Sequence, residues 1–182
     1  VRQWAFRLEL DRLFGRPTSL KSRLLVPPTL LAPAMYGLRH ADQALCINQE
    51  DEEFLVARHA FPREQITGYR CGVSDDFFLG GENRPESGAL PRLLFVGSWI
   101  ERKGRRFVVE AFTRLRGEFP GLTLSVVGAG IPEREVLDSF PAEVRDGVGA
   151  LERADDRALR EAYAGHDVFL FPTFHEAWGL VL

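Results

Sequence analysis

Lys103 is the residue whose type and position most directly indicate chemistry in this sequence. It is one of only two lysines in a chain of 182 residues, and arginine supplies the other positive side chains. The lysine ammonium group is a compact point charge on a flexible stem, which suits it to a phosphate oxygen. Arg102, Arg105 and Arg106 strengthen the positive field around it. Residues 101–106 taken alone are more simply interpreted as the solvated start of a helix. The surrounding elements are therefore needed to decide between a helix start and a phosphate site.

Small residues stand near the ends of the apolar runs in this half of the chain. Ser98 follows Gly97 at the end of the first run. Gly128 and Gly130 follow the second run, and Gly149 lies near the end of a weaker third run. Ligands of open parallel sheets bind at the carboxyl ends of the strands. Glycine lets the backbone approach a ligand, and a helix that begins just beyond offers free N–H groups and the positive end of its dipole. The pattern predicts an anion site, most naturally for phosphate, while a turn role for Gly128, Gly130 and Gly149 stays open.

The segment VVGAGIPE, residues 126–133, tests whether that site belongs to a dinucleotide fold. The dinucleotide fingerprint requires a third glycine three positions after the second, and Glu133 stands there instead. Binding of NAD or FAD is therefore disfavoured, and no cofactor is expected. Pro132 suits the first turn of the helix that follows.

The elements that must position these residues alternate between strand and helix. This alternation is typical of βαβ units and predicts a parallel sheet with helices on its faces. The expected strands cover 93–97, 122–128, a weaker 144–150, and 167–171; the expected helices cover 104–119, 132–140 and 155–164.

A second, earlier α/β unit is expected before residue 77, with a strand at 43–48, a helix at 50–60 and a strand at 65–73. Residues 77–92 hold three glycines and two prolines, a composition typical of a linker. We place the domain boundary near residue 88. The chain begins at Val1 and ends within GLVL, so we interpret it as a fragment.

Composition restricts the function classes. The chain is 45% hydrophobic and 27% charged, without an apolar run near the ~20 residues of a spanning helix, so a soluble cytoplasmic protein is expected. Cys46 and Cys71 form no CxxC pair, which favours incidental thiols over a metal site or a disulfide. The net charge is −3, and one short basic run argues against nucleic-acid binding. Residues 1–45 are basic and begin with an amphipathic stretch, which favours packing on its own domain but leaves peripheral membrane contact open.

FLFPTFHEAWGLVL, residues 169–182, carries the most specific pattern. With the helix before it, this segment resembles the donor-binding half of GT-B fold retaining glycosyltransferases of the group 1, or family 4, class. The resemblance covers nearly the whole chain through the order and spacing of its parts. Those parts are Tyr163-Ala164, DVFLF, Pro172-Thr173, Glu176 through Leu180, VGSWIERKG at 96–104, VVGAG at 126–130, and Ala41-Asp42 through Gly72-Val73 and Phe77.

The resemblance implies an α/β fold of the GT-B type. Residues 1–88 would be the end of the N-terminal acceptor-side domain with its linker, and residues 89–182 the start of a Rossmann-like donor domain. Lys103 would bind the diphosphate of a nucleotide-sugar donor, and Glu176 would contact the donor sugar. Further donor contacts would come from Ser98, Arg102, Gly128, Gly130, Gly149 and the backbone N–H groups of Gly179, Leu180 and Val181. No metal ion is implied, and the acceptor could be a glycan, a lipid or a small molecule.

Several departures from the family pattern bear on activity. Ser98 stands where many members have an arginine, and Cys71 stands where asparagine is usual. The second glutamate of the family's paired motif would lie beyond Leu182, so we expect the fragment alone to be inactive. A sugar-nucleotide epimerase or phosphorylase with the same sheet stays an alternative, as do a non-catalytic nucleotide-binding relative and a nucleic-acid-binding module.

Overall fold

The computed structural model describes residues 29, 32–70, 72–77, 90–174 and 176. The chain divides into two compact units, Val1–Tyr69 (unit 1) and Arg70–Leu182 (unit 2). This division comes before the boundary predicted near residue 88, and most of the predicted linker, residues 78–89, lies outside the described residues. The amphipathic stretch at the start of the chain and Cys71 lie outside them as well. No helix in the described part of the chain is long and apolar enough to cross a membrane.

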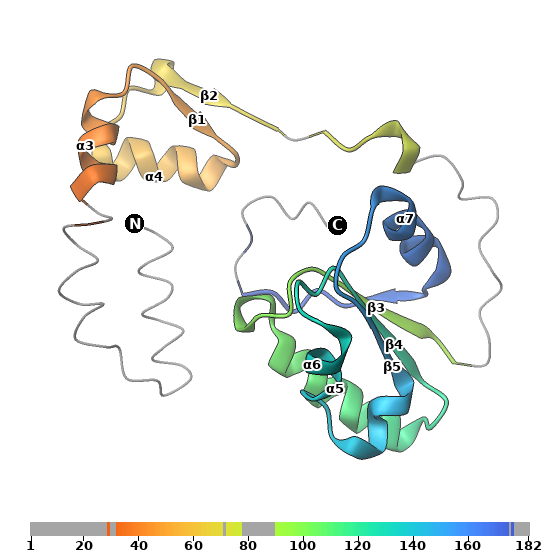
Figure 1. Ribbon diagram of the computed structural model, residues 1–182. Coiled ribbons are helices and arrows are strands. Elements are labelled where there is room, and N and C mark those ends of the chain that lie inside the picture. The colour runs from red at the N-terminus through yellow and green to blue at the C-terminus, as the bar shows by residue number, and fades with distance from the viewer. Residues whose placement is uncertain (1–28, 30–31, 71, 78–89, 175, 177–182) are drawn as a thin grey trace. The chain divides into compact units, whose positions relative to one another are not determined.

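Unit 1 is a strand–helix–strand unit preceded by a helix (Figure 1). Helix α3 covers Ala32–His40, strand β1 Ala44–Cys46, helix α4 Gln49–His59 and strand β2 Ile66–Gly68, and the two strands pair in parallel. The Asn48 side chain caps α4 by accepting a 2.8 Å hydrogen bond from the Asp51 amide. The expected strand, helix and strand are present, although the second strand is shorter than 65–73, and α3 was not expected.

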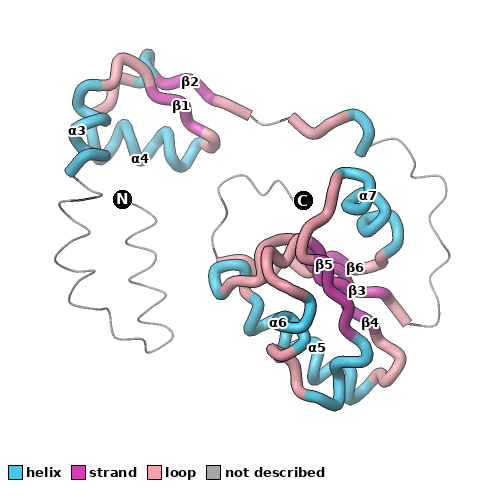
Figure 2. The backbone as a smooth tube through the Cα atoms, in the orientation of Figure 1, coloured by secondary structure: helices cyan, strands magenta, loops and turns pink. Residues whose placement is uncertain are grey.

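Unit 2 contains the predicted parallel sheet. Its strands are β3 (Arg92–Val96), β4 (Thr123–Val127), β5 (Val148–Leu151) and β6 (Val168–Phe169). All pair in parallel in the order β5-β4-β3-β6. Figure 2 shows these strands in magenta. The chain therefore builds the sheet outward from β3 through β4 to β5 and then returns to the other side of β3.

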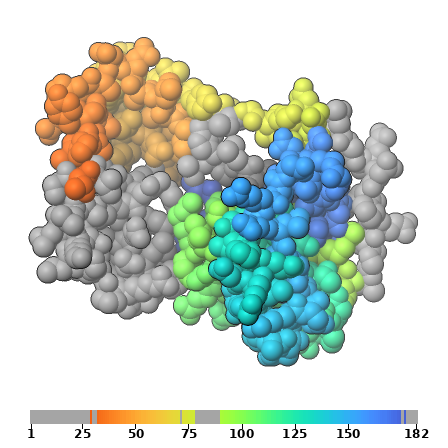
Figure 3. All heavy atoms as spheres, in the orientation of Figure 1, coloured from red at the N-terminus to blue at the C-terminus, as the bar shows by residue number. Residues whose placement is uncertain are grey.

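Helices lie on both faces of this sheet (Figure 1). Leu93 and Phe95 of β3 belong to one apolar cluster with Phe112 of α5 (Arg105–Glu118) and Val136 of α6 (Glu133–Leu137). Leu94 and Val96 belong to a second cluster with Ala162 of α7 (Asp156–Gly165). Successive strand residues point to opposite faces, so the continuous apolar run of β3 supplies both layers. Figure 3 shows α6 and α7 at the surface of the unit, as outer layers should be.

Three predicted elements of unit 2 differ from the structure. The strand expected at 167–171 covers only Val168–Phe169. The strand expected at 144–150 begins only at Val148, because Ala142–Gly147 forms a 3₁₀ helix that buries Val144. The helix expected at 132–140 ends at Leu137. Pro141 cannot donate the backbone hydrogen bond that a continuing helix needs, and the Ser139 hydroxyl bonds back to the Glu135 carbonyl at 3.2 Å.

Candidate functional site

The strand order creates a switch point between β3 and β6. The chain leaves β3 toward β4 on one side, whereas β6, the last strand described, pairs with β3 on the other side. Such a crevice is the usual ligand site of an open parallel sheet. Residues 97–104 follow β3 and residues 170–176 follow β6, which places both predicted motifs at this point.

The loop after β3 is held firmly by the core beneath it. Gly97 has a φ of +131°, and its amide donates to the Val127 carbonyl at 2.8 Å. The Trp99 side chain is 2% exposed, and its indole N–H donates to the Ser139 hydroxyl at 3.0 Å. A 3₁₀ turn over Glu101–Lys103 then leads into α5. Lys103 thus lies on a loop with a buried anchor.

The loop after β6 packs directly against the loop after β3. The Phe174 amide donates to the Arg102 carbonyl at 3.0 Å. The rings of Phe107 and Phe174 lie 5.3 Å apart between centroids. Gly104 has a φ of +78° and is so close to Pro172 that only a glycine fits there. These contacts join two segments about 70 residues apart in sequence into one surface.

Lys103 and Glu176 meet at the centre of this surface. Their ammonium and carboxylate groups form an ion pair, and the side chains are only 14% and 20% exposed. The Thr173 hydroxyl lies 3.0 Å from the same Oε1 atom of Glu176 and donates to it. The stem of Lys103 lies over Gly97, since a β carbon there would be 3.8 Å from Lys103 Cε. The two residues predicted to act on the donor are therefore in contact.

The electrostatic surroundings keep Glu176 ionised. Burial by itself raises the pKa of the Glu176 carboxyl. Hydrogen bonds from Lys103 and Thr173, together with the positive charges of Lys103 and Arg102, outweigh burial and hold this pKa below its ordinary value. At neutral pH the site therefore contains a paired cation and anion with limited exposure to water.

The remaining predicted donor contacts that the structure describes divide into three groups. Ser98 and Arg102 are exposed on the loop after β3. Gly128 and Gly130 follow β4 with φ values of +73° and +70°, and a β carbon on Gly128 would lie 4.0 Å from the Gly97 amide nitrogen. Gly149 was expected near the carboxyl end of a strand, but it is the second residue of β5, where it pairs with Ser125 of β4.

β5 begins only at Val148 and ends at Leu151, so Gly149 lies near its start and not at its carboxyl end. The backbone N–H groups of Gly179, Leu180 and Val181 lie outside the described residues. Their expected roles stay predictions.

Sequence reasoning passed over two residues that shape the site. Gly104 and Thr173 had appeared only as parts of motifs, without roles. Gly104 allows the close approach of the two loops, and Thr173 supplies a neutral hydrogen bond to Glu176. The signals were a glycine directly after Lys103 and a hydroxyl residue directly after Pro172.

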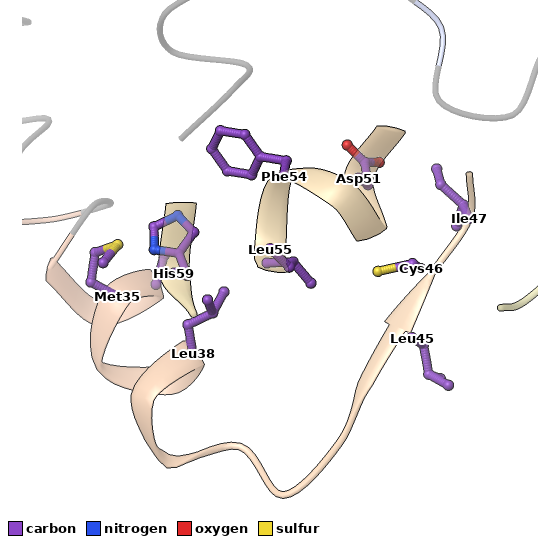
Figure 4. A pocket seen from close by; sticks show the side chains of 10 residues that line it. Met35, Leu38, Leu45, Cys46, Ile47, Asp51, Phe54, Leu55 and His59 are labelled. Atoms are coloured by element: carbon purple, nitrogen blue, oxygen red, sulfur yellow. The ribbon is translucent and has the colours of Figure 1, made fainter. Parts of the chain in front are cut away.

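Unit 1 holds a separate apolar hollow of about 370 Å³ between α3, β1 and α4 (Figure 4). Asp51 is its one acidic lining residue, and most of the other side chains are apolar. Such a surface lacks the positive groups that a phosphate needs, so the Lys103–Glu176 surface is the better anion site. The lining residues are Ala34, Met35, Leu38, Leu45, Cys46, Ile47, Asp51, Phe54, Leu55 and His59.

Comparison with known sequences identifies relatives of about half of the chain. Residues 90–182 match the family described as "Glycosyl transferases group 1". A glycogen synthase from Halorhodospira halophila is 35% identical over 94 residues, which are 51% of this chain and 19% of that protein. Glycogen synthase 2 from Nitrosococcus oceani is 31% identical over 99 residues, 53% of this chain and 19% of that protein. The chain thus matches about a fifth of the length of these relatives.

Comparison with solved structures identifies the fold. WaaG, a glycosyltransferase involved in lipopolysaccharide biosynthesis, superposes with a TM-score of 0.69 over 94% of this chain and 50% of its own, at 19% identity. A glycosyltransferase from Rickettsia africae gives a TM-score of 0.57 over 88% of this chain and 43% of its own, at 12% identity. At such identities the likeness concerns the fold alone, and it confirms the expected α/β fold of the GT-B type.

Proposed function

The chain belongs to the group 1 glycosyl transferases, and from this membership we propose that it serves to transfer a sugar from a nucleoside-diphosphate donor to an acceptor. In this reaction the acceptor oxygen forms a bond to the anomeric carbon of the sugar. The bond from that carbon to the diphosphate oxygen breaks, and the nucleoside diphosphate leaves with the electron pair. The proton of the acceptor hydroxyl passes to the departing diphosphate. We propose that the configuration at the anomeric carbon is retained.

The ion pair between Lys103 and Glu176 at the switch point carries this proposal. A departing diphosphate gains negative charge on its oxygens, and a fixed ammonium group stabilises that charge in the transition state. Lys103 is held for this task by the loop after β3, with its side chain 14% exposed. Glu176, ionised and beside it, would accept hydrogen bonds from hydroxyl groups of the donor sugar.

The other donor contacts surround this pair. Ser98 and Arg102 lie on the Lys103 loop. Gly128 and Gly130 leave space free of side chains after β4, while their amides donate to the carbonyls of Leu151 and Glu152. Gly179, Leu180 and Val181 would add backbone N–H groups to the diphosphate. Gly149 lies inside β5 at an exposed position and can contribute only through its backbone. Because positive groups of the chain would meet the diphosphate, we propose that transfer proceeds without a metal ion.

The domain roles complete the proposal. Residues 1–88 would form the last part of the acceptor-side domain, and residues 89–182 the first part of the donor domain. The acceptor is a glycan, a lipid or a small molecule. Attraction of the basic residues 1–45 to anionic headgroups would favour an acceptor at a membrane surface.

A calorimetric titration tests the proposal directly. The chain would be titrated with UDP, GDP and ADP, first without divalent metal and then with magnesium. We expect one nucleoside diphosphate to bind without metal, and Lys103→Met to weaken it about tenfold or more, since a charge-assisted hydrogen bond is lost. Arg114→Met, at a cation that is 84% exposed on α5, is the matched control and should bind normally. Equal affinity in the Lys103 variant would contradict the role of Lys103.

Ser98 favours one second candidate, a nucleotide-binding relative without transferase activity. It is exposed after β3, where the family pattern commonly has an arginine for the diphosphate. Ser98→Arg would restore that charge beside Lys103. A large gain in nucleoside-diphosphate affinity would support the second candidate, whereas unchanged affinity would show that the serine does not limit donor binding.

A further inference from the structure

Lys103 faces two anions if the proposed function holds. It is already paired with the Glu176 carboxylate, and the diphosphate of the donor would need the same ammonium group. An ammonium has three donors, so it can contact both, but the two anions then lie close together. The Lys103 and Glu176 side chains are at most one fifth exposed. Water therefore screens the repulsion between the Glu176 carboxylate and the diphosphate only weakly.

Glu176 is held in place beside Lys103, so its carboxylate stays close to a diphosphate that binds the same ammonium group. The Thr173 hydroxyl donates to its Oε1 atom at 3.0 Å. Thr173 itself lies between Pro172, which packs against Gly104, and Phe174, whose amide donates to the Arg102 carbonyl at 3.0 Å. The depressed pKa of Glu176 means that the carboxylate stays charged at neutral pH. The negative charge therefore remains beside the proposed diphosphate position.

We propose that Glu176 competes with the diphosphate for Lys103, and that this competition makes the site prefer a nucleotide sugar to a bare nucleoside diphosphate. A bare diphosphate draws Lys103 away from Glu176 and offers the carboxylate no hydrogen-bond donor in exchange. A nucleotide sugar carries hydroxyl groups that can donate to Glu176 and replace the lost hydrogen bond. Glu176 would thus weaken binding of the leaving product and strengthen binding of the intact donor. This inference rests on the proposed function.

The discriminating variant is Glu176→Gln, which removes the charge but keeps the shape and an oxygen for the Thr173 hydroxyl. Calorimetry would compare it with the wild-type chain for inorganic pyrophosphate, for UDP, GDP and ADP, and for the glucose conjugate of each. We expect pyrophosphate and the bare diphosphates to bind about tenfold more tightly to the variant. The preference for the sugar conjugate should fall, because glutamine accepts hydrogen bonds without charge. Glu176→Ala gives a second charge-free variant if the first does not fold.

A second substitution shows whether the gain acts through Lys103. In the Lys103→Met background, Glu176→Gln should no longer increase affinity for pyrophosphate by a comparable factor. A gain that persists undiminished in that background would overturn the competition, since the carboxylate would then act on the ligand without Lys103.

The outcomes separate this inference from the proposed function. If wild-type protein binds a nucleoside diphosphate through Lys103 but Glu176→Gln binds it equally or less tightly, the competition is wrong and the donor function stands. If the variant gains affinity for pyrophosphate while neither the nucleoside nor the sugar adds any, the competition for Lys103 stands, and the donor function and sugar preference fall. Absence of binding to every ligand by wild type and variants would overturn both.

Discussion

Gly104 lies against the backbone of Pro172, so that the loop after β3 touches the loop after β6 without any side chain between them. A β carbon at Gly104 would come within 2.1 Å of the Pro172 carbonyl oxygen, far inside any real contact. This approach brings the neighbouring Lys103 and Thr173 to the same carboxylate, that of Glu176. The contact is therefore the structural basis of the candidate site.

Substitution of Gly104 by alanine should destabilise unit 2 strongly. The added methyl group meets fixed backbone, and the φ of +78° is itself unfavourable for alanine. We expect a loss of about 3 kcal/mol or more in the free energy of unfolding, measured by urea denaturation. Gly130→Ala is the matched control, because Gly130 has a φ of +70° but nothing within 4 Å. It should lose only about 1–2 kcal/mol, and equal losses in the two variants would contradict a steric role for Pro172.

The Lys103–Glu176 pair predicts a specific acid dependence of stability. The folded-state pKa of Glu176 is depressed, so ionised Glu176 stabilises the fold above the unfolded pKa, about 4.3, and this stability is lost as pH falls through the folded pKa. Free energies of unfolding of wild type and Glu176→Gln should differ by a constant amount above about pH 5 and converge below it. Urea denaturation at a series of pH values measures this, and a difference that does not shrink in acid would contradict the pairing.

Trp99 should contribute much more to stability than the residue that follows it. Its indole N–H bonds the Ser139 hydroxyl at 3.0 Å, and its ring stacks on Phe140 at 5.7 Å between centroids. Trp99→Phe removes the hydrogen bond and leaves a void, which we expect to cost about 1–3 kcal/mol in urea denaturation. Ile100→Ala, at a side chain that is 42% exposed, should stay within about 1 kcal/mol of wild type. Equal effects would argue against a buried anchor for the Lys103 loop.

Arg160 should hold residues 75–77 on helix α7. Its guanidinium group lies 3.3 Å from Asp76 Oδ2 and 5.9 Å from the centre of the Phe77 ring. Exposed contacts of this kind are worth about 1 kcal/mol or less, so Arg160→Ala should change global stability little. Hydrogen exchange of the Phe77 amide, which donates to the Ser74 carbonyl at 3.0 Å, should accelerate. Arg157→Ala, on the same helix but paired with Glu161, should leave that exchange unchanged.

Predictions from the sequence succeeded where local patterns suffice and failed where packing decides. The apolar run before Gly97 and the helical spacing after Gly104 correspond to β3 and α5. Val144 and Val148 carry the same β-branched side chain, yet one lies in a 3₁₀ helix and the other in β5. A short apolar run is compatible with a helix or a strand, and only pairing with a neighbouring strand determines which of the two forms. The wrong position expected for Gly149 within its strand follows from that ambiguity.

The sequence by itself determined the alternation of strands and helices, the glycines that end the strands, and the family to which unit 2 belongs. It also singled out Lys103 and Glu176, each within its own motif. Only the tertiary structure decided that these residues, separated by 73 positions, form an ion pair. The physical reason is that β6 pairs with β3 and not with β5, which precedes it in the chain. Hydrogen bonding between parallel strands is not local in sequence, and only that pairing brings the ammonium group to the carboxylate.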